Sequence, residues 1–383
     1  MSVTAPGGFR AAGITAGLKA SGKPDLALVV NDGPLAAAAG VFTRNRIVAA
    51  SVPWTRQVLR DGEMRAVVLN SGCANAFTGP QGFADVHASA EKVAAVLDIS
   101  AADVGVCQTG VIGVLAAMDL LLAGIDVAAG ELSADGGERA ATAIMTTDSV
   151  AKQVVVERDG WRVGAMAKGA AMLAPSLATM LVVLTTDAVS AAPTLDAALR
   201  AATAVTFDRV DVDGCTSTND TVLLLASGAS GIDPGAEAMA EAVAEACRDL
   251  ALQMIADAEG ASKQVTIEVV GAASEADALE AARAIGRDTL VKCALAGSDP
   301  NWGRVVAALG MSQAAFEPEN VEVAMNGVVV CSGGGPVPSA ADADLRPHEV
   351  TITVDLNKGD ASAWVWTTDL TQLYVELNSE YTT

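Results

Sequence analysis

A threonine stands between a small-residue loop and a strongly apolar stretch near the middle of the chain. The segment KGAAMLAPSLATMLVVL runs from Lys168 to Leu184, and Thr179 opens its apolar half. On its own this pattern is typical of the start of a strand, where a β-branched residue suits β structure. A threonine made N-terminal by a chain cut can also be a nucleophile, because its own α-amine then serves as the base. The pKa of an α-amine is about 7.7 to 8, so an appreciable neutral fraction exists at cellular pH.

Histidine is scarce in this chain. His87 and His348 are the only two, so a Ser-His-Asp triad, a Cys-His pair or a multi-histidine metal site would have to be built from them. The scarcity favours catalysis that needs no histidine, and an N-terminal threonine would supply it. We expect neither a metal nor another cofactor.

The composition excludes several classes of protein. With 383 residues, of which 51% are hydrophobic and 18% charged, the chain can form one large or two ordinary domains, and disorder is excluded. Its 46 acidic and 24 basic residues give a net charge of −22. Such a surface repels phosphate backbones and acidic membranes, so we expect no nucleic-acid or membrane partner.

The cysteines and the apolar stretches indicate a cytoplasmic protein. Six cysteines occur without a C-x-x-C pair, and we expect them to be reduced thiols of the core. Residues 1–10 contain no apolar signal region, and the most apolar stretches, such as 180–185, are too short to span a bilayer.

The remaining pattern predicts a mixed α and β fold with helices covering sheets. Apolar residues at helical spacing predict helices at 82–97, 114–123, 236–256 and 275–285. Short apolar runs predict strands at 26–30, 65–69, 104–107, 265–270, 321–325, 350–354 and 363–366, and a hairpin at 154–157 and 161–167.

Several stretches, taken together and in order, give the chain a specific resemblance. The segment 174–181, APSLATML, resembles the self-cleavage site of the ornithine acetyltransferases, which are also called glutamate N-acetyltransferases and belong to the arginine pathway. The similarity extends almost from end to end. It includes residues 70–76, 109–113, 143–148, 213–214, 217–221, 257–260, 299–304, 369–371, 374–375 and 378–383.

The resemblance implies a precursor that cuts itself between Ala178 and Thr179. An α chain of residues 1–178 and a β chain of residues 179–383 would result. The implied fold is a layered α/β/β/α sandwich similar to the N-terminal-nucleophile hydrolases but differently connected. Residues 179–272 would complete this catalytic core, and about 273–383 would form a smaller C-terminal α/β domain. The usual assembly of the family, two α and two β chains, is expected here.

The implied reaction is ping-pong acyl transfer. Thr179 would take the acetyl group from N-acetylornithine and pass it to glutamate, with its own amine accepting the proton. The resemblance assigns the oxyanion role to the side chain of Thr109 and the backbone N–H of Gly110. It also places around the substrate Thr146 or Thr147, Lys168, Thr179, Glu259, Asn378 and Thr383.

The charges of two residues in this set suggest how the substrate is held. We assign Lys168 to the substrate carboxylate and Glu259 to its ammonium group. No other charged residue occurs in 164–172, so we expect Lys168 to be buried. The C-terminal segment NSEYTT would ordinarily be a frayed tail, whereas the resemblance implies that it folds into the site.

Some residues depart from the family pattern or have a second interpretation. Gln108 stands where the family has a small residue before Thr-Gly, and it either points away or alters the pocket wall. Cys215 stands where a carboxylate or a small residue is usual. Asp211, Asp213 and Asp220 resemble a metal cluster, but the family uses this stretch as a supporting loop, and we assign no metal. The DPNWGR motif at 299–304 is interpreted as a packed turn.

Two alternatives and one question about the donor stay open at this point. An aminopeptidase or amidase on the same scaffold would pass its acyl-enzyme to water. A binding protein would keep the fold and never cleave, although the intact Ala178-Thr179 sequence argues against it. The sequence also leaves open whether acetyl-CoA serves as a second donor, and whether the enzyme serves the primary arginine pathway or a specialised one.

Overall fold

The computed structural model describes residues 2–173 and 180–380 and divides the chain into two compact units. Unit 1 contains residues up to Asp208 and then Cys215–Met254. Unit 2 contains Arg209–Gly214 and the chain from Ile255 onward. Each unit is described by itself.

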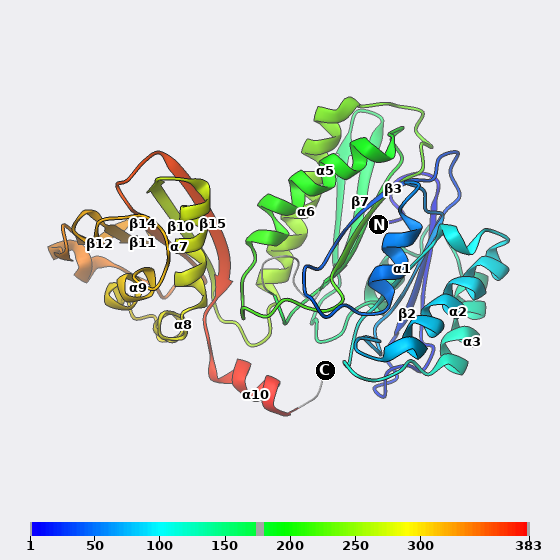
Figure 1. Ribbon diagram of the computed structural model, residues 1–383, viewed down its shortest axis with the longest axis horizontal. Coiled ribbons are helices and arrows are strands. Elements are labelled where there is room, and N and C mark those ends of the chain that lie inside the picture. The colour runs from blue at the N-terminus through cyan, green and yellow to red at the C-terminus, as the bar shows by residue number, and fades with distance from the viewer. Residues whose placement is uncertain (1, 174–179, 381–383) are drawn as a thin grey trace. The chain divides into compact units, whose positions relative to one another are not determined.

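The first sheet of unit 1 has four strands in the order β1-β2-β4-β5, of which only β4 and β5 are parallel neighbours. Helices α2 and α3 cover its outer face (Figure 1), where Val86, Val93 and Ile125 pack on the sheet residues Leu28 and Val68. The elements are β1 Phe9–Ile14, β2 Leu26–Asn31, β4 Ala66–Asn70, β5 Val104–Gln108, α1 Ser51–Val58, α2 Gly79–Leu97, α3 Met118–Gly130 and α4 Gly137–Ala143.

The second sheet of unit 1 has five strands in the order β3-β9-β8-β7-β6. Strands β8 and β9 run parallel, and the other neighbours are antiparallel. Helices α5 and α6 lie along its outer side (Figure 1). The elements are β3 Ala37–Phe42, β6 Lys152–Arg158, β7 Trp161–Lys168, β8 Leu181–Thr186, β9 Thr221–Ala226, α5 Ala192–Val205 and α6 Gly235–Ala256.

The two sheets of unit 1 pack face to face. Val29 and Leu69 of the first sheet share one buried cluster with Met166, Val183 and Leu223 of the second. With helices outside both sheets, the order of layers is α/β/β/α. This confirms the expected fold class.

Unit 2 is a smaller α/β domain built on one mixed sheet of six strands, in the order β13-β12-β11-β14-β10-β15. Its buried cluster joins Ile267 and Ile352 of the sheet to Ile285 of α7 and Val305 of α9. The elements are β10 Gln264–Ala272, β11 Glu322–Met325, β12 Val328–Ser332, β13 Gly335–Pro336, β14 Glu349–Asp355, β15 Ala361–Thr368, α7 Glu275–Arg287, α8 Thr289–Ala296, α9 Trp302–Leu309 and α10 Gln372–Glu380. Short 3₁₀ helices lie at Ala101–Asp103, Phe207–Arg209, Pro318–Asn320 and Pro338–Asp342.

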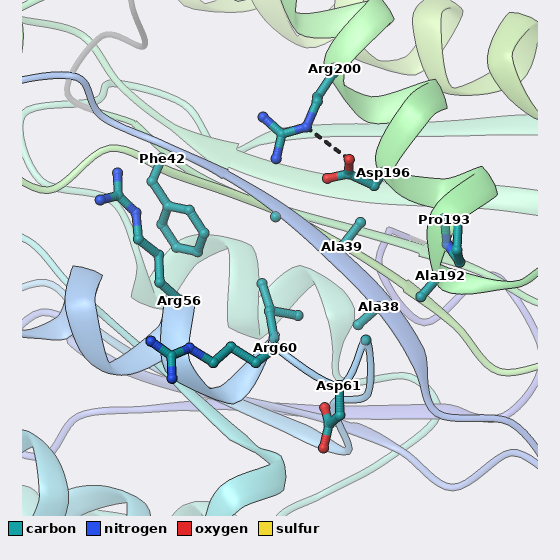
Figure 2. Close-up of a pocket in the computed structure, with 13 residues that line it drawn as sticks. Ala38, Ala39, Phe42, Arg56, Arg60, Asp61, Ala192, Pro193, Asp196 and Arg200 are labelled. Carbon is teal, nitrogen blue, oxygen red and sulfur yellow. Dashed lines mark hydrogen bonds and ion pairs between the residues drawn. The ribbon is translucent and has the colours of Figure 1, made fainter.

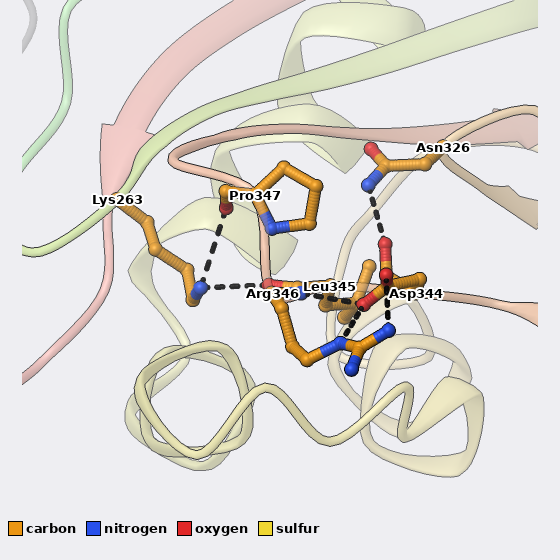
Figure 3. Close-up of polar contacts among 6 residues, drawn as sticks. All are labelled: Lys263, Asn326, Asp344, Leu345, Arg346 and Pro347. Atoms are coloured by element: carbon orange, nitrogen blue, oxygen red, sulfur yellow. Dashed lines mark hydrogen bonds and ion pairs between the residues drawn. The ribbon is translucent and has the colours of Figure 1, made fainter.

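The lysine immediately before β10 holds a neighbouring loop of unit 2. The Nζ of the buried Lys263 donates hydrogen bonds to the carbonyl oxygens of Leu345 (2.7 Å) and Pro347 (3.4 Å). Figure 3 shows this ammonium beside the loop, whose residue Asp344 accepts a bond from Asn326 on its carbonyl oxygen (2.7 Å) and pairs with Arg346. Backbone carbonyls thus satisfy this buried cation, and its role is structural.

Two sequence expectations are wrong in detail. The helix expected at 114–123 begins only at Met118, because Val114 and Leu115 are exposed and do not form a buried helical face. Cys215 and Cys293 are exposed rather than part of the core, although all six cysteines are free thiols. Cys215 lies in the loop before β9, and Cys293 lies on α8 between the buried residues Lys292 and Ala294.

Candidate active site

The residues predicted to form the oxyanion hole follow directly after strand β5. The N–H of the buried Thr109 donates to the carbonyl oxygen of Asn70 (2.9 Å), so the turn is fastened to the end of β4. Gly110 has a φ of +130°, and a Cβ there would lie 2.7 Å from the backbone nitrogen of Cys73. Only glycine fits this close approach of two backbones.

The loop 70–76 supports this turn through its polar side chains. Asn70 Nδ2 donates to the carbonyl oxygen of Cys73 (2.9 Å), and Ser71 Oγ donates to that of Ala143 (2.5 Å). Asn75, with a φ of +49°, donates to the carbonyl oxygen of Gly82 (2.9 Å) at the start of α2. The loop therefore connects β4 to α2 and to the end of α4.

Gln108 points into the protein. It is 1% exposed, and its Oε1 accepts a hydrogen bond from Nδ2 of Asn75 (3.0 Å). Its Nε2 is buried and has no hydrogen-bond partner among the residues that the structure describes. The side chain of Gln108 is therefore turned toward the loop 70–76.

A buried carboxylate brings two predicted substrate residues together. Asp148 Oδ2 accepts the N–H of Thr146 (2.9 Å), and its Oδ1 accepts Nζ of Lys152 (2.6 Å) and the N–H of Gly169 (2.7 Å). Burial raises the pKa of this carboxyl, but the positive charges of Lys168 and Lys152 outweigh that effect and lower the pKa to about 2. Asp148 therefore stays ionised and holds Thr146 close to the end of β7.

Lys168 is the last residue of β7 and is 2% exposed, as its uncharged sequence neighbourhood indicated. In the antiparallel ladder it pairs with Leu181, the first residue of β8. Ala178 and Thr179 lie outside the described residues, but the chain resumes at Met180. The predicted substrate lysine is thus registered against the residue two positions after the predicted nucleophile.

A second lysine, which the sequence pattern did not indicate, lies near this group. Lys19 Nζ donates to the carbonyl oxygens of Met145 (2.6 Å) and Pro24 (2.8 Å). Burial lowers its pKa to about 8, with Asp25 opposing this shift and Lys168 adding to it. Lys19 thereby fastens the N-terminal loop to the residue before Thr146. No local pattern around residue 19 indicated this role, because the partner is 126 residues away.

The loop before β9 contacts both the candidate oxyanion turn and the start of β8. Asn219 Nδ2 donates to the carbonyl oxygens of Ala74 and Gln108, each at 2.7 Å. Asp220 Oδ1 accepts the N–H of Met180 (3.0 Å). Burial raises the pKa of Asp220 well above its usual range, only partly opposed by the Met180 N–H and by the charge of Lys168.

The predicted site residues of unit 2 also meet. Asn378 Nδ2, on α10, donates to Oε2 of Glu259 (3.0 Å). Helix α10 is fastened where it starts, because Thr371 Oγ1 donates to the carbonyl oxygen of Gly260 (2.5 Å) and accepts the N–H of Tyr374 (3.1 Å). The chain up to residue 380 is therefore a docked helix and not a frayed tail, while Thr383 lies outside the described residues.

The histidines and the aspartates of the suspected metal cluster have other contacts. His87 lies on α2 beside Glu91 and the ring of Trp54, and His348 Nδ1 is 2.9 Å from the carbonyl oxygen of Ser262. Asp211, in unit 2, pairs with Arg287 (2.7 Å). Within the described ranges, no group of three or more His, Cys, Asp or Glu side chains could hold a metal ion.

Unit 1 also has a pocket of about 490 Å³ that contains none of the predicted site residues. Figure 2 shows Arg56 and Arg60 on one side of Phe42 and Arg200 on the other. The guanidinium of Arg56 lies 5.2 Å from the centroid of the Phe42 ring, and Arg200 Nε donates to Asp196 (2.8 Å). Two of the three arginines thus already have a partner within the protein, Arg56 in the Phe42 ring and Arg200 in Asp196. We therefore assign no role to this pocket.

No helix in the described ranges has both the length and the apolar character needed to cross a bilayer.

Comparison with known proteins gives one family over nearly the whole chain. The model of the ArgJ family matches residues 10–383. The arginine biosynthesis bifunctional protein ArgJ of Streptomyces coelicolor is 62% identical over 381 residues, with 100% of both chains covered. The protein of the same name from Thermobifida fusca is 58% identical over 383 residues, again with 100% of both covered. A crystal structure of ornithine acetyltransferase complexed with ornithine, from Mycobacterium tuberculosis, is 60% identical. It covers 46% of this chain and 95% of that chain, with a TM-score of 0.45.

Proposed function

The chain belongs to the ArgJ family and is an acyltransferase of arginine biosynthesis, and on that premise we propose that it moves an acetyl group from N2-acetyl-L-ornithine to L-glutamate through an ester on Thr179. L-ornithine and N-acetyl-L-glutamate are the products. The proposal rests on the family, on the residues that carry the resemblance and on the contacts around Lys168, Asp148 and Thr109.

The first step makes the nucleophile. Thr179 Oγ attacks the carbonyl carbon of Ala178, the C–N bond breaks, and the released amine takes the proton. Water then hydrolyses the ester. The α chain, residues 1–178, and the β chain, residues 179–383, remain associated, with two copies of each in the assembly. We expect the enzyme to act in the cytoplasm.

The transfer itself has two halves. Thr179 Oγ attacks the acetyl carbonyl while the α-amine of the same residue accepts the hydroxyl proton and then passes it to the departing ornithine amine. The α-amine of glutamate next attacks the acetyl ester, the C–O bond to Thr179 Oγ breaks, the α-amine of Thr179 carries the proton from the attacking amine to that oxygen, and N-acetylglutamate leaves. Each half passes through a tetrahedral oxyanion, for which the Thr109 hydroxyl and the Gly110 N–H are the proposed donors.

The charged residues fit a zwitterionic substrate. A buried ammonium such as that of Lys168 attracts a carboxylate more strongly than an exposed one would, because the local dielectric is low. Asp148, held ionised beside Lys152, orients Thr146 in the same neighbourhood. Glu259, with Asn378 as its hydrogen-bond partner, is the proposed acceptor for the substrate ammonium, and Thr383 is proposed to complete the site.

One observation carries the proposal furthest. Lys168 pairs with Leu181 across the β7–β8 ladder, so a cation suited to a carboxylate lies beside the strand that Thr179 precedes in sequence. Neighbouring antiparallel strands are about 5 Å apart, so the backbone of Lys168 lies about that far from the first residue of β8.

The test combines intact mass with a transfer assay. Wild-type protein should appear as two chains and form N-acetylglutamate from N-acetylornithine and glutamate. Thr179→Ala should give one uncut chain without transfer. Two fragments from that variant would contradict the proposal. Release of acetate without any transfer to glutamate would support the amidase alternative, and an uncut, inactive wild-type chain would support the binding protein.

The relatives from Streptomyces coelicolor and Thermobifida fusca are named bifunctional proteins, and we infer that acetyl-CoA is the second donor for the same acceptor. Rates with N-acetylornithine and with acetyl-CoA, measured side by side with glutamate, test this. A rate with acetyl-CoA that Thr179→Ala abolishes would place both donors on one nucleophile. No rate above background would make the enzyme monofunctional.

A further inference from the structure

The side chains of two adjacent residues before β9 form hydrogen bonds with two different parts of unit 1. Asn219 and Asp220 are 3% and 0% exposed, and they immediately precede Thr221, the first residue of the strand. The side chain of Asn219 contacts the end of β5, and that of Asp220 contacts the start of β8. The family resemblance predicts that this stretch is a supporting loop, and the sequence pattern indicates no specific role for either residue.

Asn219 fixes the peptide group that leads into the candidate oxyanion turn. Its Nδ2 donates to the carbonyl oxygen of Gln108 at 2.7 Å. This carbonyl and the N–H of Thr109 belong to the same peptide group, and that N–H donates to Asn70 at 2.9 Å. Both polar atoms of the group are therefore held. The second Nδ2 bond, to Ala74 at 2.7 Å, fixes the orientation of the amide.

Asp220 and the peptide group after it hold Met180, the residue that follows the candidate nucleophile in sequence. Its Oδ1 accepts the N–H of Met180 at 3.0 Å, and the N–H of Thr221 donates to the carbonyl oxygen of Met180 at 3.1 Å. The Met180 nitrogen is covalently bonded to the carbonyl carbon of Thr179. After self-cleavage this peptide bond is the sole covalent link between Thr179 and the rest of the β chain.

We propose that Asn219 and Asp220 act together as a positioning pair, which keeps Met180, the residue that follows the nucleophile in sequence, and the oxyanion donors after β5 at a fixed separation. The inference rests on the proposed function. Neither residue is expected to touch the substrate. A displacement of about 1 Å between reacting groups can lower a rate by roughly 100-fold, and two buried side chains on adjacent residues leave little freedom for such a displacement.

The test uses substitutions that remove or keep each hydrogen bond. Asp220→Ala and Asn219→Ala should each slow self-cleavage and lower kcat by roughly 100-fold, with KM for N-acetylornithine changed less than about threefold. Asp220→Asn keeps an oxygen that can accept the Met180 N–H, so it should stay within about threefold of the wild-type kcat. Because the pair acts as one unit, the double alanine variant should lose little more than the worse single variant.

Asp187→Ala is the matched control at the other end of the same strand. Asp187 directly follows β8 and is 8% exposed, and its carboxylate accepts the N–H of Gly7 (3.0 Å) and of Arg162 (2.8 Å). Its loss should lower Tm and leave cleavage and kcat close to wild type. A general effect of losing a buried aspartate next to an end of β8 would instead lower kcat in this variant as well.

Several results would overturn the inference. Normal kcat and cleavage in both alanine variants would do so, as would an effect on KM alone or a failure of Asp220→Asn to restore kcat. If Asp220→Ala does not fold, Asp220→Asn and Asn219→Ala still decide between these outcomes. If wild-type protein is neither cut nor active, the proposed function fails; if wild type works and the variants match it, only the positioning pair fails.

Discussion

Asp148 and Lys152 form an ion pair from which solvent is fully excluded, with 2.6 Å between Oδ1 and Nζ. Lys168 adds a second positive charge close to the same carboxylate. The carboxylate of Asp148 is the anion that both buried lysines face. It is therefore needed for the stability of the fold as well as for the position of Thr146. An isolated buried charge is very costly, so the three groups depend on one another.

Asp148→Ala should therefore lower the free energy of unfolding by about 3 to 5 kcal/mol, the range for breaking one side of a buried ion pair. Urea unfolding at pH 7 measures it. The control is Asp196→Ala, which removes the exposed partner of Arg200 and should cost less than about 1 kcal/mol. An equal loss of unfolding free energy in the two variants would show that the buried ion pair of Asp148 contributes no more to stability than an exposed one.

Asp211→Asn should change how stability depends on pH. Burial raises the pKa of Asp211 to about 6 despite the ion pair with Arg287, whereas an unfolded aspartate has a pKa of about 3.9. The folded state therefore binds the proton more tightly, and this contribution is present below pH 4 and is lost as the pH rises through 6. At its upper limit the loss is about 3 kcal/mol.

Urea unfolding of both proteins at pH 4, 5, 6 and 7 checks this prediction. The stability of the asparagine variant relative to wild type should increase from pH 4 to pH 6 and then level off. A constant difference over this interval would mean that Asp211 has an ordinary pKa.

Thr109→Val should reduce acetyl transfer by roughly 100-fold to 1000-fold, the cost of removing one oxyanion donor. Valine keeps the branched shape and loses the hydroxyl, while the backbone bond from residue 109 to Asn70 remains possible. Thr109→Ser restores the hydroxyl and should recover most of the rate. If valine and serine have the same kcat, the hydroxyl is not an oxyanion donor.

Gly260→Ala should release helix α10. Gly260 has a φ of +63°, and a Cβ there would lie 2.4 Å from the backbone nitrogen of Tyr374. Amide hydrogen exchange in residues 372–380 should rise sharply, and KM for N-acetylornithine should rise with it because Asn378 leaves Glu259. Gly231→Ala is the matched control, since it has a φ of +70° and nothing within 4 Å of the added Cβ. Unchanged exchange in the Gly260 variant would show that the helix can shift without undocking.

The sequence predicted the regular elements well where burial follows a simple period. The helix expected at 82–97 is present as α2 Gly79–Leu97. Val86, Ala90 and Val93, three of the apolar residues whose spacing indicated it, are buried, whereas Phe83 of the same set is exposed. Strands β2, β4, β5 and β8 are buried along their whole length, and their sequences are apolar except for one or two polar residues at the end. The helical spacing gave a wrong helix start at Val114 and Leu115, because a sequence pattern does not distinguish an exposed apolar residue from a buried one.

The polar framework of the site could not be predicted in this way. Lys19, Asp148 and Asn219 act through partners that the fold brings together, up to 145 residues away in the case of Asn219. Asp148 and Lys152 are four residues apart, which suggests a helical pair, yet Lys152 begins a strand. Family resemblance gave Lys168, Glu259 and Asn378 as predicted substrate residues. It gave no information about which carboxylates and amides hold them in place.

The segment Arg209–Gly214 has a consequence for how the protein is made. It belongs to unit 2, where Val210 bridges to Trp366 and Asp211 pairs with Arg287, although unit 1 continues after it as far as Met254. On the ribosome, Val210 is synthesised about 150 residues before Trp366. At about 5 to 20 residues per second this is a delay of roughly 8 to 30 s. Unit 1 can thus fold while the segment Arg209–Gly214 is still exposed to water. The sheet of unit 2 is complete only when β15 has left the ribosome.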